Sequence, residues 1–295
     1  IDGIGLGYGA YYTSSDYSAF NASAYSTDSL GFSTNLILPI DEIQQLGLSL
    51  AVDQTEISID AFSSQQLIDY VNTEGDSQQA LTLGASWTRN TLNRGLFPTL
   101  GTLNQVSANI AVPPSDVTYG RIQYKFRYYN PIFLNLIFSS RNEIGALFAY
   151  GGTESSPPYQ NFYAGGLNSV RGFKQNTLGP KAIYSSGFYV TNRPAGGAYL
   201  LEGGFDFIFN LPFLDDTRSI RSSFFLDYGN VFSDECKTYE IRCNEFDLGE
   251  LRYSIGLGFT WITALGPLSF SISSALNSDE FDETEGFQFE IGNQF

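Results

Sequence analysis

Apolar and polar side chains alternate along most of this 295-residue chain. In residues 119–129, for example, apolar or aromatic side chains lie at every second position, and Arg121, Gln123 and Lys125 lie between them. Alternation with a period of two is typical of a β-strand whose two faces meet different surroundings. The pattern predicts twelve strands, over residues 3–12, 30–38, 47–52, 79–87, 101–112, 119–129, 136–150, 198–209, 220–231, 251–261, 268–275 and 286–295.

The apolar faces of these strands are too many for one water-excluding core. Nearly every strand from residue 79 to 295 carries an apolar face that is rich in Phe and Tyr. A soluble β-sandwich could not bury all of these faces, whereas a membrane barrel turns them to lipid and lines its lumen with the polar faces. The sequence therefore predicts an all-β protein, an antiparallel transmembrane β-barrel of about 12 strands.

The connections between the strands alternate in length. Long connections cover residues 53–78, 151–197, 232–250 and 276–285. Short connections cover residues 39–45, 90–100, 130–135, 210–219 and 263–267. Outer-membrane barrels have this asymmetry, with long loops outside and short turns toward the periplasm. No linker interrupts the pattern, so we expect a single domain over residues 1–295.

Composition excludes several classes of function. The formal charge is −16, from 15 Lys and Arg against 31 Asp and Glu, which argues against a nucleic-acid partner. The chain has no His, which removes Ser-His-Asp and Cys-His catalysis and the common His metal sites, and we predict neither enzymatic activity nor a cofactor. It has no Met and no signal peptide, so we expect a mature or trimmed fragment.

The longest stretch without alternation, residues 151–197, holds a Gly-rich segment at 163–179. This segment of residues 163–179, which we call the central loop, carries four Gly residues and two of the few cations, Arg171 and Lys174. Loops as long as residues 151–197 are usually functional or disordered in compact proteins, and this one has many side chains suited to packing. We expect it to fold back on the protein, with Arg171 seeking a buried anion.

The central loop contains Val170, Arg171, Gly172 and Phe173, and these residues resemble the VRGF/Y motif of the BamA-like family of outer-membrane assembly factors. The wider segment NFYAGGLNSVRGFKQNTLGPKA is similar to the same family, and residues 89–101, RNTLNRGLFPTLG, resemble its NRGxFPTxG hairpin. The resemblance implies that the loop folds into the lumen and that its Arg pairs with acids on the barrel wall. The implied function is to fold and insert nascent outer-membrane proteins by strand pairing at a weak lateral seam.

Three acids on predicted strands are candidate partners of Arg171. Glu202, Asp206 and Asp227 must point inward, because a charge facing lipid at mid-depth costs about 2–4 kcal/mol for Arg or Lys. The resemblance places Asp206 and Asp227 at the family's wall acids, within EGGFDF and SFFLDYGNVF. Alternatively, these acids hydrate the lumen or pair with Arg221.

The last predicted strand resembles the C-terminal β-signal of bacterial outer-membrane proteins. The residues of this strand that are expected to face lipid are Phe287, Phe289, Ile291 and Phe295. Gly292 is expected to weaken the pairing near the end of the strand. In the family, this weak terminal strand forms half of the seam. The family barrel has about 16 strands after periplasmic POTRA domains, and the resemblance begins near the family's fifth strand, so we expect a chain without the first four strands and the POTRA domains. A smaller barrel could close between residues 3–12 and 286–295, or the sheet could stay open.

Cys236 and Cys243 lie close together in an acidic loop. In an oxidising envelope we expect a local disulfide, since a metal site would need more thiols or His.

The resemblance also implies partners and a place in the cell. The partners are unfolded outer-membrane protein substrates, outer-membrane lipid and lipopolysaccharide, and assembly-complex lipoproteins that act mainly through POTRA domains. The location is the bacterial outer membrane. The alternative function is a two-partner-secretion translocator or another outer-membrane pore, which would need a central loop able to clear the channel.

Overall fold

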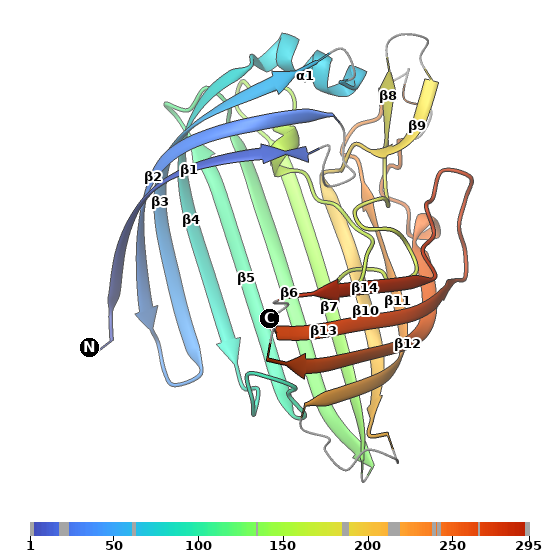
Figure 1. Cartoon of the computed structure of the whole chain (residues 1–295). Helices are drawn as coiled ribbons and strands as arrows, with labels where there is room; N and C mark the ends of the chain where they lie inside the picture. Colours follow the sequence, from blue (N-terminus) through green and yellow to red (C-terminus); the bar gives the residue numbers. More distant parts are fainter. Residues whose placement is uncertain are drawn as a thin grey trace.

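The computed structural model describes residues 3–17, 24–60, 63–133, 135–184, 189–211, 219–237, 240, 243–264 and 266–292. Figure 1 shows one large curved sheet with a small hairpin beside it. The hairpin pairs β8 (Lys181–Tyr184) with β9 (Tyr189–Pro194). The large sheet has twelve strands in antiparallel order: β1 (Gly5–Asp16), β2 (Tyr25–Pro39), β3 (Gln44–Ile59), β4 (Ser77–Asn90), β5 (Gly101–Val112), β6 (Tyr119–Phe133), β7 (Leu136–Ala149), β10 (Tyr199–Phe209), β11 (Ile220–Phe232), β12 (Arg252–Thr263), β13 (Gly266–Ala275) and β14 (Phe287–Ile291).

The predicted all-β, twelve-stranded fold is therefore confirmed, and the two faces of the sheet differ as the alternation indicates. On the convex side, apolar side chains such as Leu257 and Phe287 are 55% and 59% exposed. On the concave side, polar neighbours such as Ser254, Ser271 and Gln288 are buried. A sheet with an exposed apolar outer face and a polar inner face is the arrangement of a membrane barrel.

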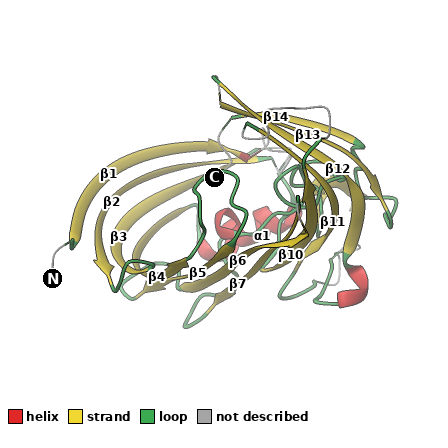
Figure 2. Ribbon diagram, turned by 90° about the horizontal axis from the view of Figure 1, so that it is seen from below, coloured by secondary structure: helices red, strands yellow, loops and turns green. Residues whose placement is uncertain are grey.

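The sheet does not close. Within the described residues, β1 pairs only with β2, and β14 pairs only with β13. Figure 2 shows the sheet curling like an incomplete barrel, with β1 and β14 at its two ends. Of the two possibilities that the sequence left, the structure has the open sheet, and each end strand presents an unpaired edge.

Two predicted connections contain regular structure that the sequence pattern did not show. The expected connection 53–78 begins too early, because β3 continues to Ile59 and the connection holds α1 (Gln65–Glu74). The Ser64 hydroxyl accepts a hydrogen bond from the Leu67 N–H and so caps the start of this helix. The expected loop 151–197 contains the β8–β9 hairpin and a short 3-10 turn, η2 (Pro158–Gln160).

The last strand is shorter than predicted. β14 ends at Ile291, and Gly292 follows with a backbone φ of 136°, which favours glycine. Phe295 lies outside the described residues.

The long connections gather at one end of the sheet and the short turns at the other, as Figure 1 shows for α1 and the β8–β9 hairpin. The Gln66 amide of α1 donates to the Lys181 carbonyl at 3.0 Å and accepts from the Ile183 N–H at 3.1 Å. No helix in the described part of the chain is both long enough and apolar enough to span a membrane.

The main buried cluster lies between the central loop and the concave side of the sheet. Val170, Phe173 and Leu178 of the loop pack in one cluster with Leu200 of β10 and Val231 of β11. All three loop side chains are fully buried. The loop is therefore a second layer against the C-terminal half of the sheet.

Candidate functional site in the central loop

The central loop approaches the wall closely at Gly172. Its φ is 92°, and a Cβ there would lie 3.2 Å from Ser254 Cβ of β12 and 3.3 Å from Ser273 Oγ of β13. A side chain would be strained by the backbone conformation and crowded by both strands. Because Gly172 has no side chain, the loop backbone can lie close to the wall, and the flanking Arg171 and Phe173 can contact it.

Arg171 points at the fully buried carboxylate of Asp227 on β11. The Arg171 Nε donates to Asp227 Oδ2 at 2.6 Å, and one terminal nitrogen donates to Oδ1 at 2.8 Å. The Arg171 backbone N–H also donates to Oδ2, at 3.1 Å. Two parallel hydrogen bonds between a guanidinium and a carboxylate fix both direction and distance.

A second acid and an aromatic ring complete the surroundings of this guanidinium. Asp206 Oδ1 of β10 lies 3.0 Å from the same terminal nitrogen of Arg171 and accepts from the Ser223 hydroxyl at 3.2 Å. The Arg171 Cζ lies 3.4 Å above the centroid of the fully buried Phe225 ring. A cation over an aromatic face is attracted by the ring quadrupole, and the ring also excludes water.

Arg141 of β7 holds the loop from the other side of Asp227. One terminal nitrogen lies 2.8 Å from Asp227 Oδ1 and donates to the Ser169 carbonyl at 2.6 Å, and the other donates to the Asn168 carbonyl at 2.9 Å. Two arginines and two aspartates thus balance in charge within the cluster. A buried carboxylate between two guanidinium groups is strongly stabilised relative to a lone one.

Of the predicted wall acids, the structure brings Asp206 and Asp227 to Arg171 and directs Glu202 elsewhere. Glu202 accepts a short hydrogen bond from the Ser169 hydroxyl. Arg221, the alternative partner of the acids, donates to the Pro98 carbonyl at 2.6 Å and lies over the Phe97 ring. Arg221 therefore ties β11 to the turn between β4 and β5, the segment that resembles the family hairpin.

Sequence reasoning missed Arg141 as a partner of Asp227 and Phe225 as the ring beneath Arg171. Arg141 faces inward by the alternation, but nothing in the sequence pairs it with a particular acid. Phe225 offers a clearer signal, because it interrupts the polar face of its strand between Ser223 and Asp227. An aromatic residue on a lumen face indicates that something covers it.

The predicted seam residues lie at the open end of the sheet. Phe287, Phe289 and Ile291 point outward and are exposed, whereas Gln288 is buried beneath the central loop. The Gly292 N–H donates to the Pro267 carbonyl at 3.1 Å. The seam residues therefore lie on the outer face of β14, whereas the Arg171 cluster lies on the inner face of β7, β10 and β11.

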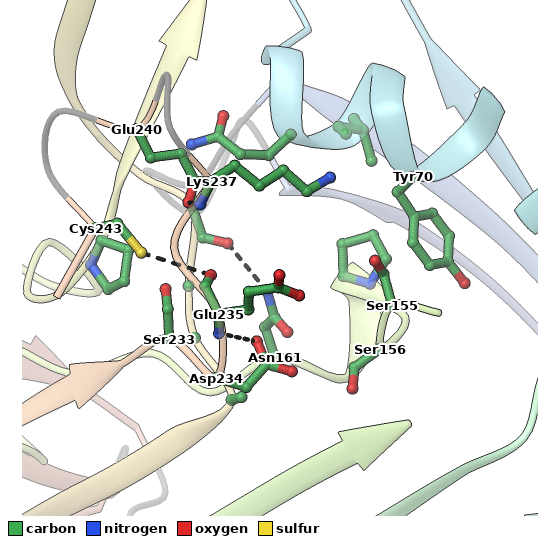
Figure 3. A pocket seen from close by; sticks show the side chains of 18 of the residues that line it. Tyr70, Ser155, Ser156, Asn161, Ser233, Asp234, Glu235, Lys237, Glu240 and Cys243 are labelled. Atoms are coloured by element: carbon green, nitrogen blue, oxygen red, sulfur yellow. Dashed lines mark hydrogen bonds between the residues drawn. The ribbon is translucent and has the colours of Figure 1, made fainter. Parts of the chain in front are cut away.

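The predicted disulfide between Cys236 and Cys243 is confirmed, and it borders an outer pocket. The cavity has a volume of about 140 Å³. Figure 3 shows it between α1, residues 155–161 and the disulfide segment. Within the described chain, Cys236, Glu240 and Cys243 have a spacing that could suit a metal ion. Both sulfurs are oxidised, however, and a disulfide offers no thiolate ligand. We assign the pocket no chemistry.

A family profile and individual proteins resemble this chain. The profile described as "Omp85 superfamily domain" matches residues 2–295. The outer membrane protein assembly factor BamA of Neisseria meningitidis serogroup B is 30% identical over 322 residues, which cover 100% of this chain and 40% of that protein. The chain thus spans less than half of this relative's length.

Two solved structures share the fold. BamA from Haemophilus ducreyi lacking POTRA domains 1–3 matches with a TM-score of 0.91 and 29% identity, over 98% of this chain and 58% of that chain. CdiB from Acinetobacter baumannii matches with a TM-score of 0.54 and 15% identity, over 98% of this chain and 47% of that chain. The CdiB match shows the fold alone.

Proposed function

Because this chain belongs to the Omp85 superfamily, a family of the bacterial outer membrane, we propose that it is the barrel part of an outer-membrane protein assembly factor. The observation that carries the proposal is the buried ion pair between Arg171 and Asp227, which fixes the motif loop against the wall. The same motif first indicated this family in the sequence. The relatives named as BamA are assembly factors, which supports the role for this chain.

The proposed mechanism needs a strand edge and no catalytic group. An unfolded outer-membrane protein presents its terminal strand, which pairs with an open edge of this sheet by β-augmentation. Both β1 and β14 have such edges among the described strands. Unpaired backbone N–H and C=O groups are costly in hydrocarbon, so an incoming strand that satisfies them is stabilised. A weak seam and a thinned bilayer lower the barrier to insertion.

The central loop gives the barrel its shape in this proposal. Arg171 and Arg141 join the loop to β7, β10 and β11 through Asp206 and Asp227. These anchors keep the C-terminal half of the sheet in one curvature while its edge exchanges partners. The proposed partners are unfolded outer-membrane proteins and the surrounding lipid and lipopolysaccharide, with accessory lipoproteins acting mainly through POTRA domains.

A two-partner-secretion translocator or another pore is the alternative function. A pore requires a loop that leaves the lumen, whereas Val170 and Phe173 of this loop are fully buried and Arg171 makes two ion pairs. The similarity to CdiB extends only to the fold. The anchored loop therefore favours the assembly role.

The test uses this chain reconstituted in liposomes. A urea-unfolded eight-stranded outer-membrane protein is added, and its folding is followed by heat-modifiable gel mobility. We expect faster folding than in liposomes that hold an unrelated barrel at equal mass. Equal rates in the two preparations would contradict the assembly role, and large single-channel conductance from this chain would support the pore instead.

A further inference from the structure

The central loop contacts the terminal strand as well as the wall acids. After Arg171, residues 172–174 run antiparallel to residues 283–285, which precede β14. The Lys174 N–H donates to the Glu283 carbonyl at 2.8 Å, and the Glu285 N–H donates to the Gly172 carbonyl at 2.9 Å. Phe173 and Thr284 form the bridge between these two hydrogen bonds. The loop thus serves as a short extra strand for the chain that enters β14.

Gln288 continues this contact from within β14. Its Nε2 donates to the Phe173 carbonyl at 2.8 Å, and its Oε1 accepts from the Gly172 N–H at 3.2 Å. The amide therefore satisfies one donor and one acceptor of the loop backbone, and it is 5% exposed. A glutamine is suited to this position because it offers both a donor and an acceptor at the end of one side chain.

Two outer contacts flank this amide. Asn168 Nδ2 donates to Glu290 Oε2 of β14 at 3.2 Å, and Lys174 Nζ forms an ion pair with Glu283 Oε2 at 2.8 Å. These contacts are more exposed, and an exposed ion pair contributes about 0–1 kcal/mol. Gln288 is thus the buried centre of a line of contacts from the loop to β14.

The terminal strand needs such support because its pairing in the sheet is sparse. β14 pairs with β13 over five residue pairs, from Leu268↔Ile291 to Ile272↔Phe287, and its other edge has no partner among the described strands. Short edge strands fray readily, and a strand with one partner can slip in register. A one-residue slip would turn Phe287 and Phe289 inward and move Gln288 toward lipid.

We propose that the central loop clamps β14 in register from the lumen side, and that Gln288 is the residue that positions this strand for pairing at the seam. This inference rests on the proposed assembly function, because strand pairing at the seam is a step of that function. The clamp contacts the inner face of β14 and leaves free the backbone edge that faces away from β13. The Arg171 cluster supports the clamp indirectly, because it fixes residues 170–174 on the wall.

The test measures amide hydrogen exchange of the folded chain in detergent, read by mass spectrometry on peptides that cover β14. Gln288→Leu removes both loop hydrogen bonds, and we expect exchange in residues 287–291 to accelerate at least tenfold. Exchange in β4 to β6 should stay unchanged, which separates a local loss of register from general unfolding. Ile272→Val, on the outward face of β13, is the matched control and should leave the exchange rate of β14 unchanged.

A milder variant keeps the test decisive if Gln288→Leu fails to fold. Asn168→Ala with Lys174→Ala removes the two outer contacts and retains Gln288, and we expect an increase of about threefold in the exchange of β14. Unchanged β14 exchange in a folded Gln288→Leu variant would overturn the clamp, as would unchanged exchange in the double variant where Gln288→Leu does not fold. Exchange is measured without substrate, so the clamp can fail while the liposome assay succeeds, and the reverse.

Discussion

The two halves of the sheet have the same strand pattern and very different surroundings. The concave faces of β10 and β11 lie under the central loop, and Asp227, Phe225 and Val231 there are fully buried. The described residues of β1 are mostly exposed on both faces, and Asp53 of β3 accepts a hydrogen bond from the Tyr11 hydroxyl of β1. Alternation therefore decides which residues form strands, and the loop decides which half is anchored.

This difference assigns separate tasks to the two halves. The C-terminal half has a buried charged network that fixes its curvature, and breaking such a network leaves uncompensated charges. The N-terminal half is held by its ladder hydrogen bonds, by the packing of α1 on Ile57, and by ties from Arg221 to the β4–β5 turn and from Gln66 to β8. Substitutions of the same type should therefore cost far more in the C-terminal half.

The largest effect is expected from Asp227→Ala. This change leaves Arg141 and Arg171 without their shared carboxylate, and loss of one member of a buried pair costs about 3–5 kcal/mol. The urea midpoint in detergent should fall and the central loop should become open to protease. The control is Asp53→Ala on β3, and an equal loss of stability there would remove the contrast between the halves.

Arg171→Lys should be the next most damaging change. Lysine keeps the charge but cannot make the paired hydrogen bonds to Asp227 or stack in the same way on Phe225. We expect a loss of about 1.5–3 kcal/mol, the scale of a hydrogen bond to a charged group. Urea unfolding measures it, and a wild-type midpoint would mean that charge alone anchors the loop.

Two glycines offer a matched pair for a smaller effect. A Cβ at Gly204 would lie 2.2 Å from Asp227 Oδ1, whereas a Cβ at Gly7 of β1 would meet nothing within 4 Å. Gly204→Ala should cost about 1–3 kcal/mol by overpacking, and Gly7→Ala should be neutral or slightly stabilising. Thermal unfolding followed by gel mobility compares them. Equal midpoints would show that the Asp227 site is not tightly packed.

The smallest effect is expected for the exposed pair of Lys125 and Glu143, whose charged atoms lie 3.2 Å apart. Lys125→Gln should change the free energy of unfolding by about 0–1 kcal/mol, and added salt should erase the difference. Arg141→Gln, one strand away, should cost several times more at every salt concentration. The urea midpoint at low and high salt measures both variants, and similar losses would weaken the distinction between buried and exposed charges.

Strands were predictable from the sequence wherever one face meets lipid and the other the lumen. β3 shows where this rule stops, because beyond Val52 its outward residues Gln54 and Glu56 become polar while Ile57 turns inward. Ile57 is buried with Leu67 and Tyr70 of α1, so this end of the strand follows the packing of a soluble core. The lipid pattern alone could not indicate that change.

The ion pairs of Arg171 were predictable because cations are scarce in this chain. Arg171 and the inward acids could be matched because an enclosed guanidinium needs a carboxylate. The contacts of residues 172–174 with Glu283 and Gln288 could not, since they join the loop backbone to the Glu283 backbone and to the Gln288 amide across more than a hundred residues. Backbone pairing of this kind carries no residue signature in the sequence.

A double-mutant cycle between Arg171 and Asp227 tests the anchored loop most directly. Urea unfolding in detergent would be measured for Arg171→Ala, Asp227→Ala and the double variant. The account predicts a coupling energy of about 2 kcal/mol or more, with the double variant hardly less stable than Asp227→Ala. A coupling energy within about 0.5 kcal/mol of zero would contradict the claim that this ion pair anchors the loop to the wall.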